Sequence, residues 1–300
     1  MRPVAGDAEL DAWCEAWNDG PRLLPRAAAD LRHEAAAVGL CERYAAGPAG
    51  RPSAVGALRR HFAFRQTTRL ALDLHVRPAE RGAGIGGSLL AQLLERAGAL
   101  GAEVVRAYAP AGDRAWDALA VRHGFQTVEH DRYLLLNVDQ ATMPPAPAPS
   151  VRALADEPPG AEREAWQLEQ GLHAALDTSA PFVAESFEAW RTRVLEAPGS
   201  GPGTVLVTRT PEGALAGICA LRVCTGDPGT VYHAFTGVAG EARGQGHGRA
   251  LKLAAIERAR ELGAHRLVAD TSPDNRAMLT LNERLGYVAV LDVRNLETAL

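Results

Sequence analysis

The sequence predicts an α/β protein made of two tandem copies of one domain. Three observations support this prediction: a repeated glycine motif, an order of elements shared by both halves, and a Pro/Ala-rich segment between them. The motif reads ERGAGIGGSLL at residues 80–90 and EARGQGHGRALK at residues 241–252. Arg81 and Arg243 lie 162 positions apart (243 − 81), and matches at this offset continue without a gap to Gly124 and Gly286. A repeat this long exceeds a solenoid unit and indicates two whole domains.

The segment ATMPPAPAPS at residues 141–150 lies between the copies. Alternating prolines and alanines favour an extended spacer over a packed element. We therefore expect an N-terminal domain at residues 1–140, a linker at 141–150 and a C-terminal domain at 151–300. A chain of 300 residues is long enough for each domain to bury its own core.

Each copy is expected to run from a strand through the glycine loop into a helix and a second strand. The strands are short and rich in strand-forming residues, and each helix carries apolar residues on one face. The helices are expected to end at Gly101 and Gly263, where a left-handed cap is comfortable. The expected elements are strands 70–76 and 231–238, helices 88–100 and 249–262, and strands 103–109 and 265–271.

Upstream of these elements, each copy shows helical patterns followed by strand patterns. The signal is clear in the second copy, where residues 211–213 form a turn between two strands, and it is blurred in the first. The expected second-copy elements are helices 160–176 and 185–196 and strands 204–210 and 214–223. The expected first-copy elements are helix 9–18 and strands 39–46 and 54–60.

Composition sets limits on the class of protein. With 47% hydrophobic and 23% charged residues, the chain is expected to be globular. A net charge of −4 argues against a nucleic-acid surface and suits a cationic small substrate. Lys252 is the only lysine, which together with abundant Ala, Gly and Pro we interpret as coding bias without functional meaning. The four cysteines show no CxxC pair and no histidine at ligand spacing, so we expect free thiols and no metal: Cys14, Cys41, Cys219 and Cys224.

We expect neither a signal peptide nor a membrane-spanning segment. The N-terminal residues MRPVAGDAELDAWC lack the apolar run of a signal peptide, and no segment reaches the apolar length of a membrane span. We expect a cytoplasmic protein.

The glycine loops are expected to hold phosphate. A strand that ends in a glycine-rich turn and feeds a helix directs several backbone N–H groups, and the positive end of the helix dipole, at one point. Glycine permits close approach and positive φ angles. Arg81 or Arg243, at the start of each loop, can add a charge-assisted hydrogen bond to the same phosphates.

Other interpretations of the loops fit less well. Gly82, Gly84 and Gly87 spell the GxGxxG dinucleotide fingerprint, but Arg249 stands at the third glycine position in the second copy. A nucleotide P-loop requires GK[ST], which neither copy contains. Flexible helix caps alone do not explain an Arg-Gly-x-Gly-x-Gly pattern written twice in one context.

These residues resemble the GNAT family of N-acetyltransferases. The family motif Q/R-x-x-G-x-G/A is matched at residues 81–86 and 243–248, and DNRAMLTLNERLGY at residues 274–287 is similar to the family's segment after the fifth strand. The resemblance covers roughly fifty residues in each half. It implies a mixed, mostly antiparallel central sheet flanked by helices in each domain. It also implies an acetyl-coenzyme A site, with the pyrophosphate on the loop amides and the pantetheine between splayed strands four and five.

The resemblance assigns site residues by position. In the second copy the expected cofactor-binding residues are Thr236, Gly237, Val238, Arg243, Gly244, Gln245, Gly246, His247, Gly248 and Arg249. A possible second cofactor site in the first copy comprises Val76, Arg81, Gly82, Ala83, Gly84, Ile85, Gly86 and Gly87.

The second copy is expected to be the active one. Many family members carry a tyrosine that protonates the departing thiolate; its position is Asn282 in the second copy and Ala120 in the first. Asn282 can donate a hydrogen bond to sulfur and alanine cannot. Asn275, which Asp113 replaces in the first copy, is a further catalytic candidate. Helix capping and surface solvation are the alternative roles for both asparagines.

A base and an oxyanion donor complete the expected chemistry. Alternation along residues 70–76, carried over by the 162 offset, places His233 opposite the core face and makes it a base candidate, with a satisfied structural histidine as the alternative. Glu241 and Asp177 are weaker candidates. A backbone N–H near Val238 is expected to hold the oxyanion. Tyr287 is expected to pack in the core.

Together these features predict an N-acetyltransferase that moves the acetyl group of acetyl-CoA to a primary amine of a small molecule by direct attack. The alternatives are an enzyme like mycothiol synthase and a non-catalytic acyl-CoA-binding sensor. We expect no nucleic-acid or membrane partner, and a monomer or a homodimer.

Overall fold

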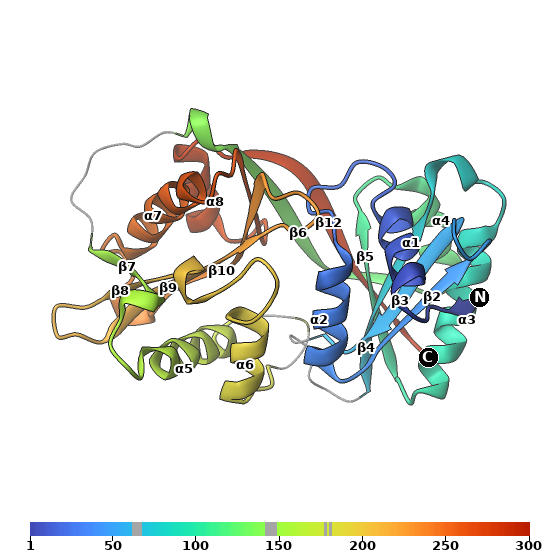
Figure 1. Ribbon diagram of the computed structural model, residues 1–300, viewed down its shortest axis with the longest axis horizontal. Helices are drawn as coiled ribbons and strands as arrows, with labels where there is room; N and C mark the ends of the chain where they lie inside the picture. Colours follow the sequence, from blue (N-terminus) through green and yellow to red (C-terminus); the bar gives the residue numbers. More distant parts are fainter. Residues whose placement is uncertain (62–67, 142–148, 177–178, 180–181) are drawn as a thin grey trace. The chain divides into compact units, whose positions relative to one another are not determined.

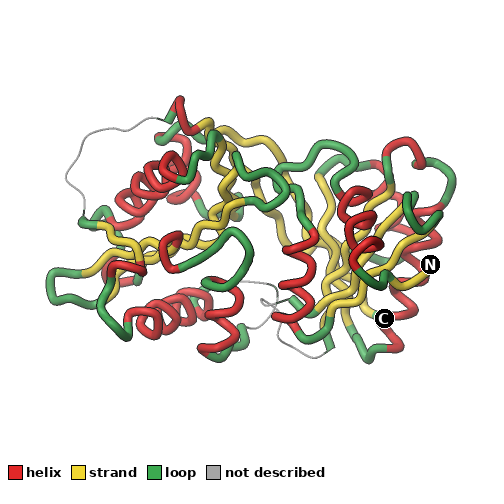
Figure 2. The backbone as a smooth tube through the Cα atoms, viewed as in Figure 1, coloured by secondary structure: helices red, strands yellow, loops and turns green. Residues whose placement is uncertain are grey.

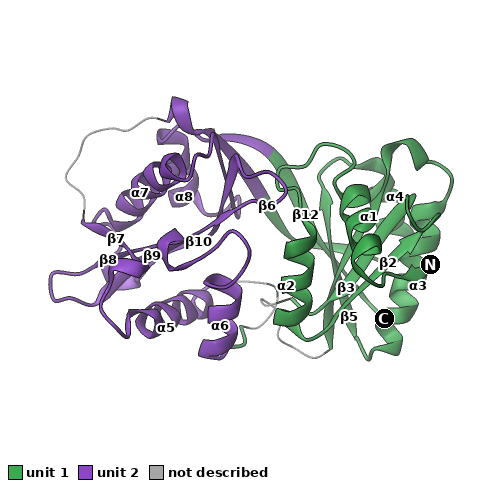
Figure 3. Ribbon diagram, in the orientation of Figure 1, with its two compact units in different colours: residues 1–131, 178–183, 291–300 green, residues 132–177, 184–290 purple. Residues whose placement is uncertain are grey.

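The computed structural model describes residues 1–61, 68–141, 149–176, 179 and 182–300 (Figure 1). Most of the expected linker at 141–150, and the base candidate Asp177, lie outside the described residues. The chain forms two compact units (Figure 3). Unit 1 contains residues 1–131, 178–183 and 291–300, and unit 2 contains residues 132–177 and 184–290.

Unit 1 has one mixed sheet with helices on both faces (Figure 2). Its strand order is β1-β2-β3-β4-β5-β12, and only the β4–β5 pair is parallel. The strands are β1 (Arg2–Pro3), β2 (Cys41–Ala46), β3 (Ala54–Arg59), β4 (Arg69–Val76), β5 (Val104–Pro110) and the greater part of β12 (Val288–Ala299). The helices are α1 (Asp7–Trp17), α2 (Ala28–Val38), α3 (Ile85–Ala99) and α4 (Arg114–Arg122), with a short 3-10 turn η1 (Pro78–Glu80).

Unit 2 repeats this plan with the strand order β6-β11-β10-β9-β8-β7, and β10–β11 is its parallel pair. The strands are the latter half of β6 (Gln126–Asn137), β7 (Val151–Ala153), β8 (Val205–Arg209), β9 (Leu215–Val223), β10 (Thr230–Val238) and β11 (Arg266–Thr271). The helices are α5 (Ala161–Ala174), α6 (Phe187–Val194), α7 (His247–Glu261) and α8 (Arg276–Arg284). Short 3-10 turns complete it: η2 (Val138–Gln140), η3 (Leu154–Asp156), η4 (Pro202–Thr204) and η5 (Gly240–Ala242).

The two halves of the sequence exchange their last strands. Residues 132–137 of β6, from the first half, pair antiparallel with β11 in unit 2. Residues 293–299 of β12, from the second half, pair antiparallel with β5 in unit 1. The compact units are therefore not the contiguous segments 1–140 and 151–300 that the sequence led us to expect, because each sheet takes its final strand from the other half.

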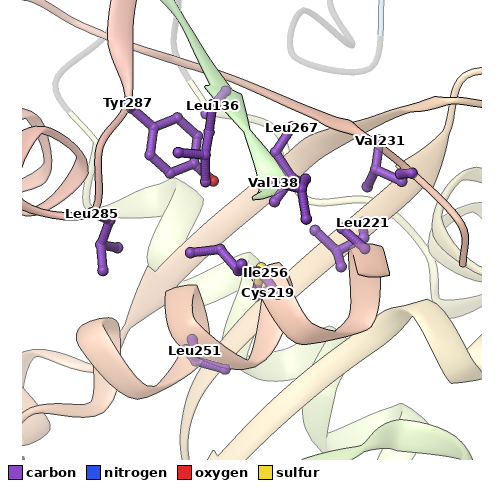
Figure 4. Packing of buried hydrophobic residues seen from close by; sticks show 14 of the residues in the cluster. Leu136, Val138, Cys219, Leu221, Val231, Leu251, Ile256, Leu267, Leu285 and Tyr287 are labelled. Carbon is purple, nitrogen blue, oxygen red and sulfur yellow. The ribbon is translucent and has the colours of Figure 1, made fainter. Parts of the chain in front are cut away.

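Each sheet buries apolar side chains on both faces. In unit 2 one face packs against α7 and α8. Leu251 and Ile256 of α7 lie in this core (Figure 4), as does Leu279 of α8. The other face packs against α5 and α6, where Trp190 is fully buried. Unit 1 has the same two layers, with α3 and α4 on one face and α1 and α2 on the other. Apolar burial on both faces is the main source of stability expected for such a three-layer domain.

The element order agrees with the sequence prediction. Both long helices stop before a glycine with positive φ, Gly101 at 79° and Gly263 at 74°, which confirms the predicted caps. The α/β class with a mixed, mostly antiparallel sheet is confirmed. The elements missed are mainly α2, α4, α8 and the exchanged strands β6 and β12. None of the described helices is both long and apolar enough to cross a membrane.

Candidate active site

The loop between β10 and α7 has the geometry of an anion cradle. Gly244 and Gly246 adopt φ angles of 76° and 90°, values at which other L-residues are strained, and Gly246 is the N-cap of α7. The first N–H groups of a helix have no intrahelical acceptor. Because the loop residues 243–246 are exposed, these N–H groups and the helix dipole are accessible to an anion.

Side chains brace this loop from within. The Nε of Arg243 donates to the carbonyl oxygen of Val238 at 3.4 Å, and Gln245 Nε2 donates to the Glu241 carbonyl at 2.8 Å. The buried His247 ring places Nδ1 3.0 Å from Thr208 Oγ1, which anchors the start of α7 to β8. These contacts hold the loop in shape before any ligand binds.

The predicted residues that flank the loop are packed closely. A Cβ built on Gly237 would lie 2.6 Å from Leu172 Cδ1, so only glycine fits without movement there. A Cβ on Gly248 would lie 3.7 Å from Val238 Cγ2, which is an ordinary contact. Thr236 donates from Oγ1 to Cys219 Sγ at 3.4 Å, and Arg249 is half-buried. Thus the residues from 236 to 249 connect the end of β10 to the first turn of α7 through closely packed contacts.

Strands β10 and β11 open beside this loop. Their parallel register ends at Tyr232 and Val268, while β10 continues to Val238. The N–H of Ala239 donates to the carbonyl oxygen of Ala216 in β9 at 2.9 Å. Successive residues of a strand turn their N–H groups to opposite edges. The Val238 N–H therefore points into the opening, where a carbonyl oxygen could accept it.

The first copy has the same backbone geometry. Arg81 Nε lies 3.3 Å from the Val76 carbonyl oxygen, and the φ angles of Gly82 and Gly84 are 86° and 77°. The parallel β4–β5 register also ends early, at Leu72. The remaining predicted residues lie in the same loop and first helical turn: Ala83, Ile85, Gly86 and Gly87.

The two copies differ at the position after the fifth strand. Asn282 on α8 is 0% exposed, and in the described part of the chain neither its Nδ2 nor its Oδ1 has a hydrogen-bond partner. A buried polar group without a partner costs about 1–3 kcal/mol. The equivalent Ala120 carries no polar side-chain atom. An unpartnered buried amide in the second copy is what a site awaiting a polar ligand group requires.

Asn275 is a helix cap. Its Oδ1 accepts from the N–H of Met278 at 3.1 Å, and Asp113 caps α4 in the same way. This geometry supports the capping alternative. Because both copies keep the cap, position 275 does not distinguish them.

His233 lies in the core, not on the opposite face as the sequence predicted. It is 5% exposed, with Nδ1 3.4 Å from Cys219 Sγ and Nε2 2.8 Å from the Tyr287 hydroxyl. Burial, with the charge of Lys252, holds its pKa well below the usual value. A base needs an accessible nitrogen of suitable pKa. The structure therefore favours the satisfied structural histidine.

A β-bulge explains this error. Leu70 pairs with Val105 in β5, and Val231 pairs with the equivalent residue Leu267 in β11, so the offset before the bulge is 161 (231 − 70). The register on β9 shifts between His233 and Phe235, and from there the offset is 162. One extra residue moves preceding side chains to the other face. His233 thus corresponds to the buried Leu72.

The other base candidates gain no support. Glu241 is exposed at the edge of the loop, where its backbone carbonyl accepts a hydrogen bond from Gln245. Asp177 lies outside the described residues. A water molecule remains the simplest proton acceptor for this site.

Lys252 is a feature that the sequence analysis set aside. It lies in α7, is 1% exposed, and holds its Nζ 5.4 Å from the centre of the Tyr287 ring. Burial lowers its pKa to about 8. The sequence marks this residue as unusual, because it is the single lysine among 32 Lys and Arg residues, but does not indicate that it is buried. Lysine, unlike arginine, changes its pKa readily on burial.

Comparison with known families decides the assignment of the fold. The acetyltransferase (GNAT) family matches residues 7–125 and 164–287, which include both glycine loops. The chain belongs to the GNAT family. The resemblance seen in the sequence is confirmed, and both copies carry the family domain.

Among related sequences, a mycothiol acetyltransferase of Arthrobacter sp. is 28% identical over 231 residues, covering 72% of this chain and 66% of the relative. Another, from Thermobispora bispora, is 31% identical over 226 residues, covering 72% and 71%. The chain thus spans about two thirds of the length of the first of these relatives.

Solved structures show the same tandem architecture. A tandem GNAT protein from the clavulanic acid biosynthesis pathway superposes with a TM-score of 0.77 at 22% identity, covering 99% of this chain and 97% of that protein. A GCN5-related N-acetyltransferase from Sphaerobacter thermophilus gives a TM-score of 0.69 at 21% identity, covering 97% and 91%. These similarities establish the fold of this GNAT protein.

The residues present fit a coenzyme A ligand in the second copy. The exposed glycine cradle suits a pyrophosphate, and the unpartnered Asn282 amide suits a polar atom at the other end. Within the described residues no group of three or more His, Cys, Asp or Glu side chains could hold a metal ion.

Proposed function

We propose that this GNAT protein transfers the acetyl group of acetyl-CoA to a primary amine of a small molecule, and that the second copy carries the activity. The observation that supports this proposal is the combination, in unit 2, of the glycine cradle with the buried, unpartnered side chain of Asn282. Unit 1 has the cradle but has Ala120 at the second position.

The cradle positions the cosubstrate. The amides at Gly244, Gly246 and His247 would hold the pyrophosphate, with Arg243 adding charge. The opening between β10 and β11 would take the pantetheine arm as an additional strand, since backbone groups there lack a partner strand. The thioester would then lie near Val238, where the N–H faces the opening.

The chemistry needs few side chains. The neutral amine nitrogen attacks the thioester carbon, and the Val238 N–H stabilises the oxyanion. When the C–S bond breaks, its electron pair stays on sulfur, to which Asn282 Nδ2 donates a hydrogen bond. The proton lost by the nitrogen passes to water. Acetyl-CoA supplies the activated acyl group.

The first copy has a different role in this proposal. Its loop keeps the geometry of a phosphate site, so it could hold coenzyme A without turning it over. We infer that it is structural or a vestigial binder, because Ala120 offers no hydrogen bond to a departing sulfur.

Calorimetric titration with acetyl-CoA tests this proposal, followed by a screen of primary amines for thiol release. We expect binding at about one equivalent and turnover with one class of amine. Binding without turnover on any amine would favour a non-catalytic acyl-CoA sensor. No binding at all would contradict the acetyltransferase proposal.

A second candidate is acetylation in the manner of the mycothiol acetyltransferases. The observation in its favour is the identity of 28–31% to two proteins of that name. The protein should then release CoA from acetyl-CoA in the presence of the deacetylated form of mycothiol. A kcat/KM for that amine no higher than for simple primary amines would contradict this candidate.

A further inference from the structure

The buried cation at Lys252 has no role in the mechanism described so far. In the described part of the chain its ammonium makes no ion pair, although it is 1% exposed. A buried charge is normally paired, because removing an ion from water is expensive. An unpaired ammonium in a core suggests that its partner is a charge that appears during function.

The groups that face Lys252 come from every element packed around it. They are the Cys219 thiol on β9, the His233 imidazole on β10, the Asp270 carboxylate on β11 and the Tyr287 phenol after α8. Burial raises the pKa of Cys219 and that of Tyr287, and burial lowers the pKa of His233, so all three are neutral near pH 7. Asp270 acts on Lys252 electrostatically.

Lys252 lies on the face of α7 that borders the proposed site. Gly248 lies one turn earlier on the same face. A Cβ built on Gly248 would lie 3.7 Å from Val238 Cγ2 and 4.0 Å from Leu281 Cδ2. This face of α7 therefore meets both the end of β10 and helix α8, next to Asn282. Tyr287 completes the connection, because its ring lies against Lys252 and its N–H donates to the Asn282 carbonyl at 3.0 Å.

We propose that Lys252 stabilises the negative charge that develops on the coenzyme A sulfur during acyl transfer. This rests on the proposed function. The C–S bond breaks, its electron pair becomes a thiolate lone pair, and the amine proton leaves to water, so the ammonium keeps its proton and gains an anionic neighbour. Asn282 would contact the sulfur directly. The ammonium of Lys252 would stabilise the thiolate electrostatically without touching it, because the surrounding core has a low dielectric constant.

This role replaces the one that a tyrosine has in many relatives. Asn282 can donate a hydrogen bond but cannot release a proton. A thiolate left in that environment needs a compensating charge, and the lone buried lysine supplies it. Arginine, used at every other basic position apart from histidine, is bulkier and carries its charge in a planar fork.

The test uses coenzyme A itself, so it needs no acceptor amine. The thiolate absorbance of bound coenzyme A is followed against pH in the whole protein, with the desulfo-CoA complex as a blank for the four cysteines. The variants are Lys252→Met and, as a control, Arg258→Met, which removes a partly exposed cation of the same helix. We expect a thiolate fraction about tenfold larger in the wild type and Arg258→Met than in Lys252→Met, on the order of one pKa unit.

The outcomes separate the two proposals. Equal thiolate fractions in all three proteins, with coenzyme A bound and the fold intact by circular dichroism, would overturn the role of Lys252 and leave the proposed function standing. Failure of the wild type to bind coenzyme A would contradict the proposed function, and the Lys252 role with it. If Lys252→Met does not fold, Lys252→Gln in the same titration decides the question.

Discussion

The Nε of Arg243 lies 3.4 Å from the carbonyl oxygen of Val238, and this contact joins the end of β10 to the start of the anion loop. The same contact occurs in the first copy, at 3.3 Å between Arg81 and Val76. Both loops are therefore built to one plan. The copies differ in what lies opposite the loop, where the second has the unpartnered Asn282.

Blocking the two cradles should have unequal effects. In Gly246→Trp the side chain fills the proposed pyrophosphate position, and a φ of 90° adds about 1–2 kcal/mol of backbone strain. We expect that Gly246→Trp loses both the binding of acetyl-CoA to unit 2 and the turnover of acetyl-CoA. Gly84→Trp, at φ 77°, carries similar strain and is the matched control that should keep turnover. Calorimetry and thiol release measure both.

Equal loss of turnover in the two variants, both folded by circular dichroism, would show that the second copy does not work alone. Residual binding in Gly246→Trp that disappears in the double variant would instead locate a coenzyme A site in unit 1.

Replacing Asn282 should separate stability from activity. In Asn282→Leu a similar volume is kept and two unpartnered polar atoms disappear, so the free protein should gain about 1–3 kcal/mol of unfolding free energy. The kcat should fall about tenfold or more, because the hydrogen bond to sulfur is lost. Urea denaturation and steady-state kinetics measure the two effects. A variant that is both less stable and fully active would contradict our interpretation of this side chain.

The loops could be predicted from sequence because the requirement is local. A glycine at positive φ before a helix can be recognised from two or three neighbouring residues, and Gly84 and Gly246 both occupy such a position. The face of His233 could not be predicted in this way. One inserted residue in β10 reverses the alternation of side chains from which the face of His233 was inferred. No short sequence pattern indicates such a bulge.

The exchanged strands also lie beyond local reasoning. The alternating apolar residues Leu134 and Leu136 indicate that one face of β6 is buried, but they do not indicate which sheet β6 joins. Either β5 or β11 could accept it as an antiparallel neighbour. The choice depends on contacts between residues far apart in the chain. The burial of Lys252 could not be predicted from the sequence either, because the groups around it come from separate strands, Cys219 from β9 and Asp270 from β11.

Lys252 should make stability depend on pH. With the folded pKa lowered to about 8 from 10.5, its burial costs about 3 kcal/mol below pH 8, where both folded and unfolded states bind the proton. Between pH 8 and 10.5 only the unfolded state keeps it, so stability rises with pH. Lys252→Met should therefore be more stable at pH 7 by up to about 3 kcal/mol.

The measurement is the difference in unfolding free energy between Lys252→Met and the wild type at pH 7 and pH 10, since other titrating groups cancel in it. We expect the difference to shrink between these values. A difference that is constant with pH, or one that favours the wild type at pH 7, would show that the ammonium has a stabilising partner in the free protein.

The strand exchange predicts that single core changes act in the unit opposite to their half of the sequence. Leu296 of β12 is 1% exposed in the core of unit 1, and Leu136 of β6 is 1% exposed in the core of unit 2. Truncating a buried leucine to alanine costs about 2–5 kcal/mol. Leu296→Ala should therefore destabilise unit 1, and Leu136→Ala should destabilise unit 2.

Amide hydrogen exchange read by mass spectrometry distinguishes the units, because local protection reports local stability. In Leu296→Ala, peptides from β3 and β4 should exchange faster while those from β8 and β9 stay protected; Leu136→Ala should give the reverse. The two variants serve as controls for each other, having the same chemistry and burial. Faster exchange in the half that contains the substituted residue would mean that each copy keeps its own last strand in solution. That result would contradict the strand pairing of β6 with β11 and of β12 with β5.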